Sequence, residues 1–335
     1  MSAYEQRVRD AINATSFHWP GNYSWFGRMG PRLPQRVRKS LTLKSARAYL
    51  LYNLQSQLYG DFYLCGYASP MRWETVGSVA NRTLFIDALS AANAGNGYWE
   101  AGWTIRALTP DKIVVHKGGL ELTVAPEECS ASAGIARKPG GELSLRFPKE
   151  FLCLSPGFYM ASGDRELRHD GSRPLIRLYW NLTSGGAARF VRVTTSVFNV
   201  AGLPFRLKVL DDPSRFTRCD AAVVYLCRDD FAGATGSVKR VHTDVGGYLK
   251  PLTPVFTRTL APGLGFAEDP GEEESFGQHR CRLLADAMVR GYERGAASIA
   301  ERLQVAIERF TEDGISLEEP YLNRGSIYAG FRVPW

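Results

Sequence analysis

The segment Leu203–Leu210 places two cations inside an apolar run, and this combination is the first indication of chemistry in the chain. Arg206 and Lys208 are two residues apart, so on an extended chain their side chains lie on one face of the strand. Leu207 and Val209 then lie on the opposite face. Two cations on one face indicate either a solvated sheet edge or a site that binds an anion, and the function depends on which of the two is present.

Other cations lie in or beside predicted strands. Arg177 is in the middle of the apolar run Leu175–Leu182, and Arg218 begins the second apolar run, Arg218–Leu226. Arg280 is near the start of a predicted helix. Taken singly, each is explained as well by an ion pair or an exposed position. Because a buried cation without a partner is costly, several of them together favour an oxyanion site.

The sequence offers little for other kinds of site. The glycine-rich run Leu260–Pro270 has neither a Walker lysine nor the G-x-G-x-x-G spacing, so we interpret it as a turn that shapes one wall of a pocket. The histidines are scattered, and no H-E-x-x-H pattern occurs, so we predict no metal site. No serine has the G-x-S-x-G context, and Cys219 and Cys227 lie in apolar strand runs that favour a core role.

Composition narrows the class of partner. The 335 residues carry 41 Lys and Arg against 34 Asp and Glu, a formal net charge of +7. This mild surplus suits an anionic ligand such as a phosphate or phosphopeptide, and it lacks the concentrated basic tail of a nucleic-acid binder. The six cysteines form no C-x-x-C pair, so we expect reduced core thiols in a cytoplasmic protein without disulfides. We find no signal peptide or membrane span, so no membrane partner is expected. The spread of the charge makes nucleic acid an unexpected partner as well.

The hydrophobic patterns predict an α+β fold with a mixed, largely antiparallel sheet, flanking helices and an anion-binding cleft. Helical spacing covers residues 34–60, 187–200 and the region from Ser275 onward, where Ser275 and Gln278 have the spacing of a capping box. Short alternating runs between residues 98 and 154 indicate an antiparallel meander. We predict residues 1–154 as a helical segment plus this meander and 155–335 as the core, with a soft boundary that allows one continuous domain.

The order of several short motifs resembles the HopA-type effector family. The resemblance covers residues 155–325 well and the N-terminal part loosely. The motifs that carry it are Pro204–Val209, Arg218–Tyr225, Leu260–Pro270, Ser275–Arg280 and Pro320–Asn323. That family includes bacterial type III effectors and lyase-like proteins encoded with class V lanthipeptide and thioamitide pathways.

The resemblance implies a metal-independent lyase without a cofactor. Its substrate would be phosphoserine or phosphothreonine in the precursor peptide of a ribosomally synthesised natural product, and its product dehydroalanine or dehydrobutyrine. A phosphotransferase-like kinase of the same pathway would install the phosphate and is the expected protein partner. The better-studied phosphothreonine lyases use a K-x-H pair, whereas Arg206-Leu-Lys208 stands on what we take to be the equivalent strand here.

These expectations assign roles to individual residues. Lys208 is the expected base, and it would act as a neutral amine because burial, Arg206 and Arg218 all disfavour its protonated form. The expected phosphate ligands are Arg177, Arg206, Arg218 and Arg280. The expected general acid is His279 or Tyr225, with His242 as a further candidate. The expected substrate contacts are Tyr179, Asn181 and Ser275. The alternative is a non-catalytic module that binds a phosphopeptide or a protein, which needs the cations but no base.

Overall fold

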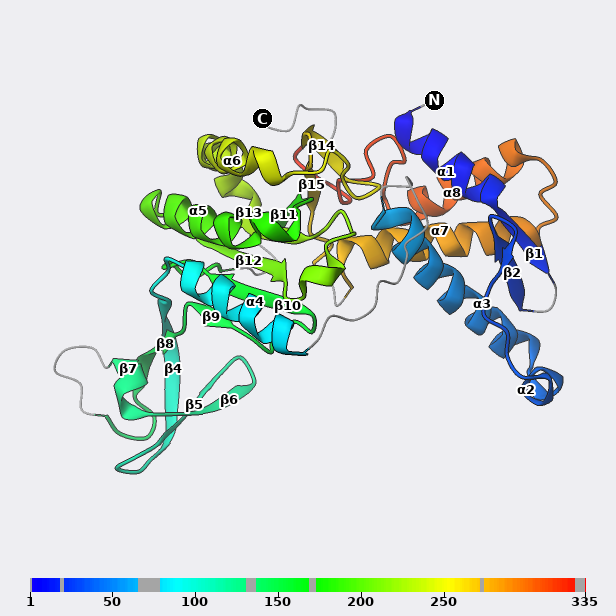
Figure 1. Ribbon diagram of the computed structural model, residues 1–335. Coiled ribbons are helices and arrows are strands. Elements are labelled where there is room, and N and C mark those ends of the chain that lie inside the picture. Colours follow the sequence, from blue (N-terminus) through cyan, green and yellow to red (C-terminus); the bar gives the residue numbers. More distant parts are fainter. Residues whose placement is uncertain are drawn as a thin grey trace.

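The computed structural model describes residues 2–18, 21–65, 79–130, 137–168, 173–271, 274–328 and 335. Within these residues the strands form three antiparallel sheets, and a seven-stranded sheet lies at the centre of the molecule (Figure 1). Its strand order is β14-β15-β11-β13-β12-β10-β9. The bounds are β9 Glu150–Phe151, β10 Phe158–Ser162, β11 Leu175–Trp180, β12 Phe205–Leu210, β13 Ala222–Cys227, β14 Arg258–Ala261 and β15 Leu264–Glu268.

One face of this sheet is apolar and covered by helices. Leu178, Val224 and Leu207 lie directly opposite one another on β11, β13 and β12, and all three are fully buried. The helices α4 (Val79–Ala92), α5 (Ala187–Val200) and α6 (Phe231–Val245) form the layer over this face (Figure 1). Because antiparallel partners point to the same side, the alternate residues of the same strands are directed to the other face.

A second helical layer lies on that other side of the sheet (Figure 1). It contains α1 (Ala3–Ala14), α3 (Leu43–Gln57), the π-helical turn η1 (Leu58–Tyr63), α7 (Phe276–Glu293) and α8 (Ile299–Glu312). The predicted capping box at the start of α7 is confirmed: the Ser275 hydroxyl accepts from the Gln278 amide, and the Gln278 side chain accepts from the Ser275 amide. The predicted helical region 34–60 is divided into α2 (Gln35–Ser40), α3 and η1.

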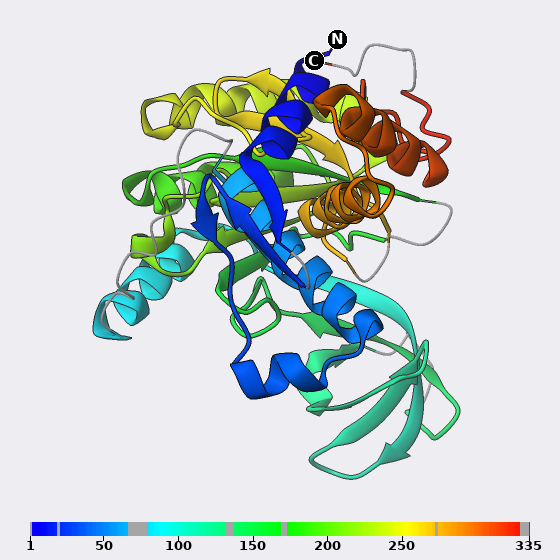
Figure 2. The same ribbon diagram turned by 90° about the vertical axis from the view of Figure 1, so that its right-hand side faces the viewer.

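The two smaller sheets lie at the edges of the molecule. The predicted meander is confirmed as a five-stranded sheet that projects from the body and has a small core of its own (Figure 2). Its strands are β4 Tyr98–Leu108, β5 Ile113–Lys117, β6 Leu120–Val124, β7 Cys129–Ser130 and β8 Glu142–Phe147. The three-stranded sheet near the N-terminus contains β1 Thr15–His18, β2 Asn22–Trp25 and β3 Arg28–Met29.

The observed architecture confirms the predicted α+β class and departs from the sequence analysis in detail. The run Leu260–Pro270 belongs to the β14–β15 hairpin, and only its last residues line a cavity. None of the six cysteines is in a disulfide, but Cys153 is exposed and therefore is no core thiol. The main hydrophobic core includes residues from both sides of residue 154, and the division of the chain there stays a prediction.

Candidate functional site

Five of the residues predicted for the site share one face of the central sheet. Arg177, Tyr225 and Arg206 lie opposite one another in a row across β11, β13 and β12. Tyr179 and Lys208 belong to the next row, and both pair with the same residue of β13. Since this face is opposite to the apolar one, the sheet presents cations and phenol rings toward the α7 side of the molecule.

Within this face, cations alternate with aromatic rings. The Arg177 guanidinium carbon is 5.3 Å from the centre of the Tyr225 ring, and the Lys208 amine is 5.8 Å from it on the β12 side. The Lys208 amine is also 4.6 Å from the centre of the Phe158 ring, and the Arg218 guanidinium carbon is 5.6 Å from that ring. Aromatic faces attract cations, so the two rings hold the Arg177, Lys208 and Arg218 side chains next to one another without neutralising their charges.

A cavity of about 790 Å³ opens beside the first row. This volume is within the range of small-ligand sites. Among the described residues its wall contains five arginines and two carboxylates. They are Arg173, Arg177, Arg206, Arg228, Arg324, Glu268 and Asp269, with Tyr225, Asn323 and Ser326 between them. The cavity is therefore suited to an anionic ligand.

The cations of this region differ in how far they are neutralised. Arg177 is 8% exposed, and its Nε donates to Asp269 Oδ2 at 2.6 Å. Burial opposes its charge, but Tyr179, Tyr225 and Asp269 raise the pKa of Arg177 well above its ordinary value. Arg206 and Lys208 form no ion pair with any carboxylate of the described residues. Arg177 is thus compensated by a carboxylate, whereas Arg206 and Lys208 have no carboxylate partner among the described residues.

Arg218 lies outside the strand in which it was predicted. The strand β13 begins only at Ala222, and Arg218 is in the connection that precedes it. Its Nη2 donates to Asp220 Oδ2 at 2.7 Å, and its Nε donates to the other carboxylate oxygen. Burial opposes its charge, but Asp220 raises the pKa of Arg218 above its ordinary value. A phosphate would have to compete with this bidentate pair for the guanidinium.

The prediction that Arg280 binds phosphate does not agree with its environment. Its side chain is 0% exposed, and it does not line the cavity. Its Nε donates to the Pro320 carbonyl at 2.8 Å, and its Nη2 donates to the Leu322 carbonyl and to Asn323 Oδ1 at 2.8 and 2.9 Å. We therefore assign Arg280 a structural role, in which it fixes the segment 320–323 against α7.

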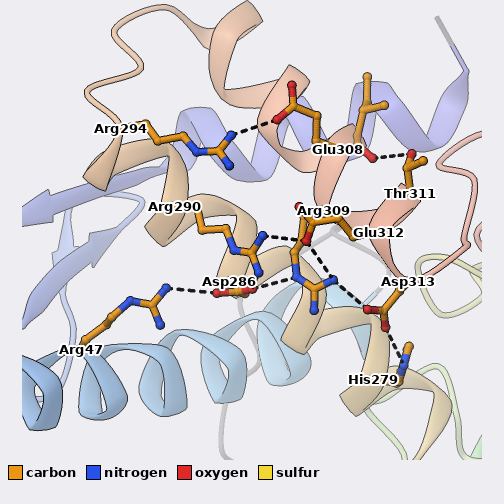
Figure 3. Close-up of polar contacts among 11 residues, drawn as sticks. Arg47, His279, Asp286, Arg290, Arg294, Glu308, Arg309, Thr311, Glu312 and Asp313 are labelled. Atoms are coloured by element: carbon orange, nitrogen blue, oxygen red, sulfur yellow. Dashed lines mark hydrogen bonds and ion pairs between the residues drawn. The ribbon is translucent and has the colours of Figure 1, made fainter.

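The prediction of His279 as general acid also has to be corrected. Its Nδ1 accepts from Arg280 Nη1 at 2.7 Å, and its Nε2 is 3.4 Å from Asp313 Oδ2 (Figure 3). Burial, together with the charges of Arg280 and Arg282, lowers the pKa of His279 to about 4. The neutral ring accepts at Nδ1 and donates from Nε2, so both nitrogens are used within the helical layer. His242 is no substitute, because it belongs to α6 on the opposite side of the sheet and contacts the Pro262 carbonyl.

The three predicted substrate contacts are all engaged in holding the fold. Ser275 caps α7, as described above. Asn181 is 3% exposed, and its Nδ2 donates to the Leu252 carbonyl at 2.9 Å. Tyr179 is 3% exposed, and its ring packs 6.3 Å from the ring of Phe276 at the start of α7. Burial raises the pKa of Tyr179, which therefore keeps its proton. None of the three lines the cavity.

The model of the HopA1 effector protein family matches residues 151–322. This range contains the central sheet from β9 to β15 and the whole row Arg177–Tyr225–Arg206. The chain belongs to the HopA1 effector protein family.

Similar solved structures include two effector proteins from Pseudomonas syringae. The protein of pathovar tomato strain DC3000 is 16% identical, with 95% of this chain and 99% of that chain covered and a TM-score of 0.48. The protein of pathovar syringae strain 61 is 13% identical, with 96% of each chain covered and a TM-score of 0.47. No curated protein matches the sequence.

The cavity of this HopA1-family chain also contains residues that the sequence analysis missed. Arg228 follows the end of β13, and Arg173 precedes β11, so both extend the cation-bearing face beyond its strands. Asn323 and Arg324 come from the C-terminal segment and lie just beyond the range that the family model matches. Asn323 belongs to a motif that carried the family resemblance, which was the available signal for that segment.

Two further features of the described residues concern metal ions and membranes. In the described part of the chain, no group of three or more His, Cys, Asp and Glu side chains is arranged to hold a metal ion. In the same residues, no helix is both long enough and apolar enough to cross a membrane.

Proposed function

We propose that this protein is a lyase that removes phosphate from phosphoserine or phosphothreonine in a peptide. The observation that carries the proposal is Lys208. Its amine has no carboxylate partner among the described residues, and it lies next to Tyr225 and on the same sheet face as Arg206. Tyr225 and Arg206 line the cavity, and Lys208 lies beside Tyr225 in the next row of the same sheet face. A base, a phenol and a guanidinium without a carboxylate partner are the groups that β-elimination of phosphate needs.

The reaction can be written with these groups alone. The neutral Lys208 amine takes the proton from Cα of the phosphorylated residue, and the electron pair of that C–H bond forms the Cα=Cβ double bond. The Cβ–O bond breaks, and the bridging oxygen leaves with the phosphate. Tyr225 donates its phenol proton to that oxygen, and the Lys208 ammonium returns a proton to Tyr225. The products are dehydroalanine or dehydrobutyrine in the peptide and inorganic phosphate.

Arg206 has the main electrostatic role in this scheme. Charge accumulates on the phosphate as the Cβ–O bond breaks, so a guanidinium that is not neutralised by a carboxylate stabilises the transition state more than the ground state. Arg177, which is held by Asp269, would contribute mainly by keeping Tyr225 in place. The scheme requires neither a metal ion nor a cofactor.

The pathway context is part of the same proposal. A phosphotransferase-like kinase would supply the phosphorylated precursor peptide, and the lyase would act on it in the cytoplasm, where that kinase has its nucleotide. The family is named for its effectors, and the biosynthetic role rests on the resemblance of the sequence motifs to the lyase-like proteins of peptide pathways.

The test uses a synthetic phosphoserine peptide and mass spectrometry. Wild-type protein should convert the peptide to the dehydroalanine form with loss of phosphoric acid. Lys208→Ala should lower the rate by roughly 10²–10⁴-fold, the usual contribution of a general base, while it still binds the peptide. Lys208→Arg is the matched variant, because it keeps a long cationic side chain that can bind the phosphate but supplies no base at neutral pH. Equal turnover by wild type and Lys208→Ala would remove Lys208 from the mechanism.

A second candidate function is a phosphopeptide-binding module without catalysis. It is favoured by the internal contacts of His279, Arg280 and Arg218, which leave the cavity with cations but with Tyr225 as its one predicted acid among the described residues. The same assay separates the two functions, since a binding module retains the phosphopeptide and releases no phosphate.

A further inference from the structure

Arg228 is fixed by hydrogen bonds of its main chain, while its guanidinium has no hydrogen-bond partner among the described residues. Its amide donates to the Pro174 carbonyl at 2.8 Å, and its carbonyl accepts from the Tyr328 hydroxyl at 3.3 Å. Its Nε is buried, yet no described residue accepts a hydrogen bond from it. A buried donor left unpaired is uncommon in native proteins and indicates a missing acceptor.

The nearby carboxylates do not supply that acceptor. Arg228 Nη1 is 3.9 Å from Glu268 Oε1, and Nε is 3.8 Å from Asp229 Oδ1, and both separations are too long for a hydrogen bond. Glu268 is instead occupied by the Asn323 amide at 2.8 Å and the Ser326 hydroxyl at 2.6 Å. The Arg228 side chain is 19% exposed and lines the cavity, so an anion entering from solvent can reach it.

Arg324 adds a second cation to the wall of the cavity. It is exposed, and no described residue forms an ion pair or hydrogen bond with it. Its aliphatic part packs on Gly314, where an added Cβ would lie 2.7 Å from Arg324 Cδ. The stem is thus supported by the protein, and the charged end is left for a ligand.

The position of Arg228 directly after the end of β13 gives the spacing of this second site. Arg228 comes three residues after Tyr225, which is about 10 Å on an extended chain at ~3.4 Å per residue. In a bound peptide of similar extension, three residues cover the same distance, and two residues cover about 7 Å, which side chains of ordinary length extend. Arg177, which is already paired with Asp269, lies in the row of Tyr225 and does not provide a free cation for the second anion.

We propose that Arg228, with Arg324, forms a second anion subsite that binds a carboxylate of the substrate peptide two or three residues from the phosphorylated residue. The proposal rests on the proposed function for the placement of the phosphate near Arg206 and Lys208. The carboxylate has two sources, an Asp or Glu side chain or the C-terminus of the peptide. In either case the cavity selects acidic phosphopeptides.

The test measures binding, so that it does not depend on turnover. Fluorescently labelled phosphoserine peptides with amidated ends carry one Glu two or three residues before or after the phosphoserine, and each has a Gln twin. A further peptide has no Glu and ends in a free carboxylate two residues after the phosphoserine, and its twin is amidated. Dissociation constants are measured by anisotropy for Lys208→Ala, for Lys208→Ala with Arg228→Gln, and for Lys208→Ala with Arg106→Gln. Arg106 is the control, since it pairs with Glu121 on the projecting sheet.

At one position at least, the carboxylate peptide should bind about tenfold more tightly than its twin, and Arg228→Gln should abolish the difference. The Arg106→Gln protein should keep it. If only the free C-terminus shows the preference, the subsite binds the end of the peptide, and if only the internal Glu does, it binds a side chain; both results support the proposal.

The proposal would be overturned if no carboxylate peptide bound more tightly than its twin. It would also be overturned if Arg228→Gln weakened the binding of both members of every peptide pair equally. Arg228→Lys is measured as well, and it should keep part of the preference. Elimination by the wild-type protein is assayed separately, so a binding module that shows the carboxylate preference would refute the lyase and leave the subsite intact.

Discussion

Two regions of this protein are rich in arginine, and they use it in opposite ways. Between α3, α7 and α8, most of the arginines are paired with carboxylates, and Asp286 alone accepts from Arg47, Arg290 and Arg309 (Figure 3). In the cavity, five arginines face two carboxylates, and one of those carboxylates is occupied by Asn323 and Ser326. The first region is largely neutralised by carboxylates of the protein, whereas in the second Arg206 and Arg324 have no carboxylate partner among the described residues.

The difference shows how a cation should be interpreted in this fold. Residue type and burial do not separate the two regions, because Arg280 and Arg309 are as buried as Arg177. What separates them is whether the guanidinium donors are used. Arg280 uses its donors on His279, on two main-chain carbonyls and on Asn323, whereas Arg228 uses none on the described residues. Unused donors beside a cavity, and not positive charge as such, identify the anion site.

The strongest test of this comparison is to make the same substitution at an arginine without a carboxylate partner and at a paired arginine. Arg206→Gln should lower the elimination rate by roughly 10²–10³-fold, the loss seen when one transition-state donor is removed, with little effect on stability. Arg218→Gln should do the reverse, because it leaves the buried Asp220 without its bidentate partner. For both variants, the elimination rate is measured by mass spectrometry and the stability by the midpoint of urea unfolding.

Equal kinetic losses for the two variants would show that Arg218 binds phosphate in spite of its pair with Asp220. The double variant Arg218→Gln with Asp220→Asn is the matched control. It removes both charges and leaves no unpaired buried carboxylate, so it should recover most of the stability that Arg218→Gln loses.

Arg280 offers a second test, since it joins the paired region to the wall of the cavity. Arg280→Gln should destabilise the protein by roughly 3–4 kcal/mol, because the carbonyls of Pro320 and Leu322 lose their donors in a buried place. The measurement is urea unfolding followed by circular dichroism. Arg294→Gln is the matched control, because its pair with Glu308 is about half exposed on both sides and should contribute less than ~1 kcal/mol.

If Arg280 instead bound phosphate, Arg280→Gln would abolish elimination while the urea midpoint stayed at the wild-type value. A smaller kinetic effect that accompanies the loss of stability is expected, since Asn323 links Arg280 to Asp269, the partner of Arg177.

Local patterns predicted the parts of the site that depend on a single strand. Alternation within Leu203–Leu210 correctly placed Arg206 and Lys208 on one face, because side-chain direction along a strand has a period of two. The helix over 187–200 and the cap at Ser275 were likewise encoded in a few neighbouring residues. The α+β class followed from the same patterns.

The failures all concern contacts between distant segments. Nothing around Arg280 shows that carbonyls 40 residues further along the chain would satisfy its guanidinium. The role of His279 depends in the same way on Asp313 of the α8 end. The sequence around Arg228 does not show whether its donors are used, and this follows only from its distances of 3.8 Å to Asp229 and 3.9 Å to Glu268.

The smallest expected effect concerns pH and the paired region. Burial, with Arg280 and Arg282, lowers the pKa of His279 to about 4, whereas its ordinary value is 6.5. Because the unfolded chain takes up this proton more readily than the folded one, the stabilisation is complete above about pH 6.5 and is lost as the pH falls toward about 4, by roughly 2 kcal/mol. Urea unfolding of wild type and His279→Gln between about pH 7 and pH 4.5 should show a steeper decline for wild type. Glutamine keeps an acceptor for Arg280 and a donor for Asp313 but takes up no proton, so identical slopes would show that His279 is not held neutral between them.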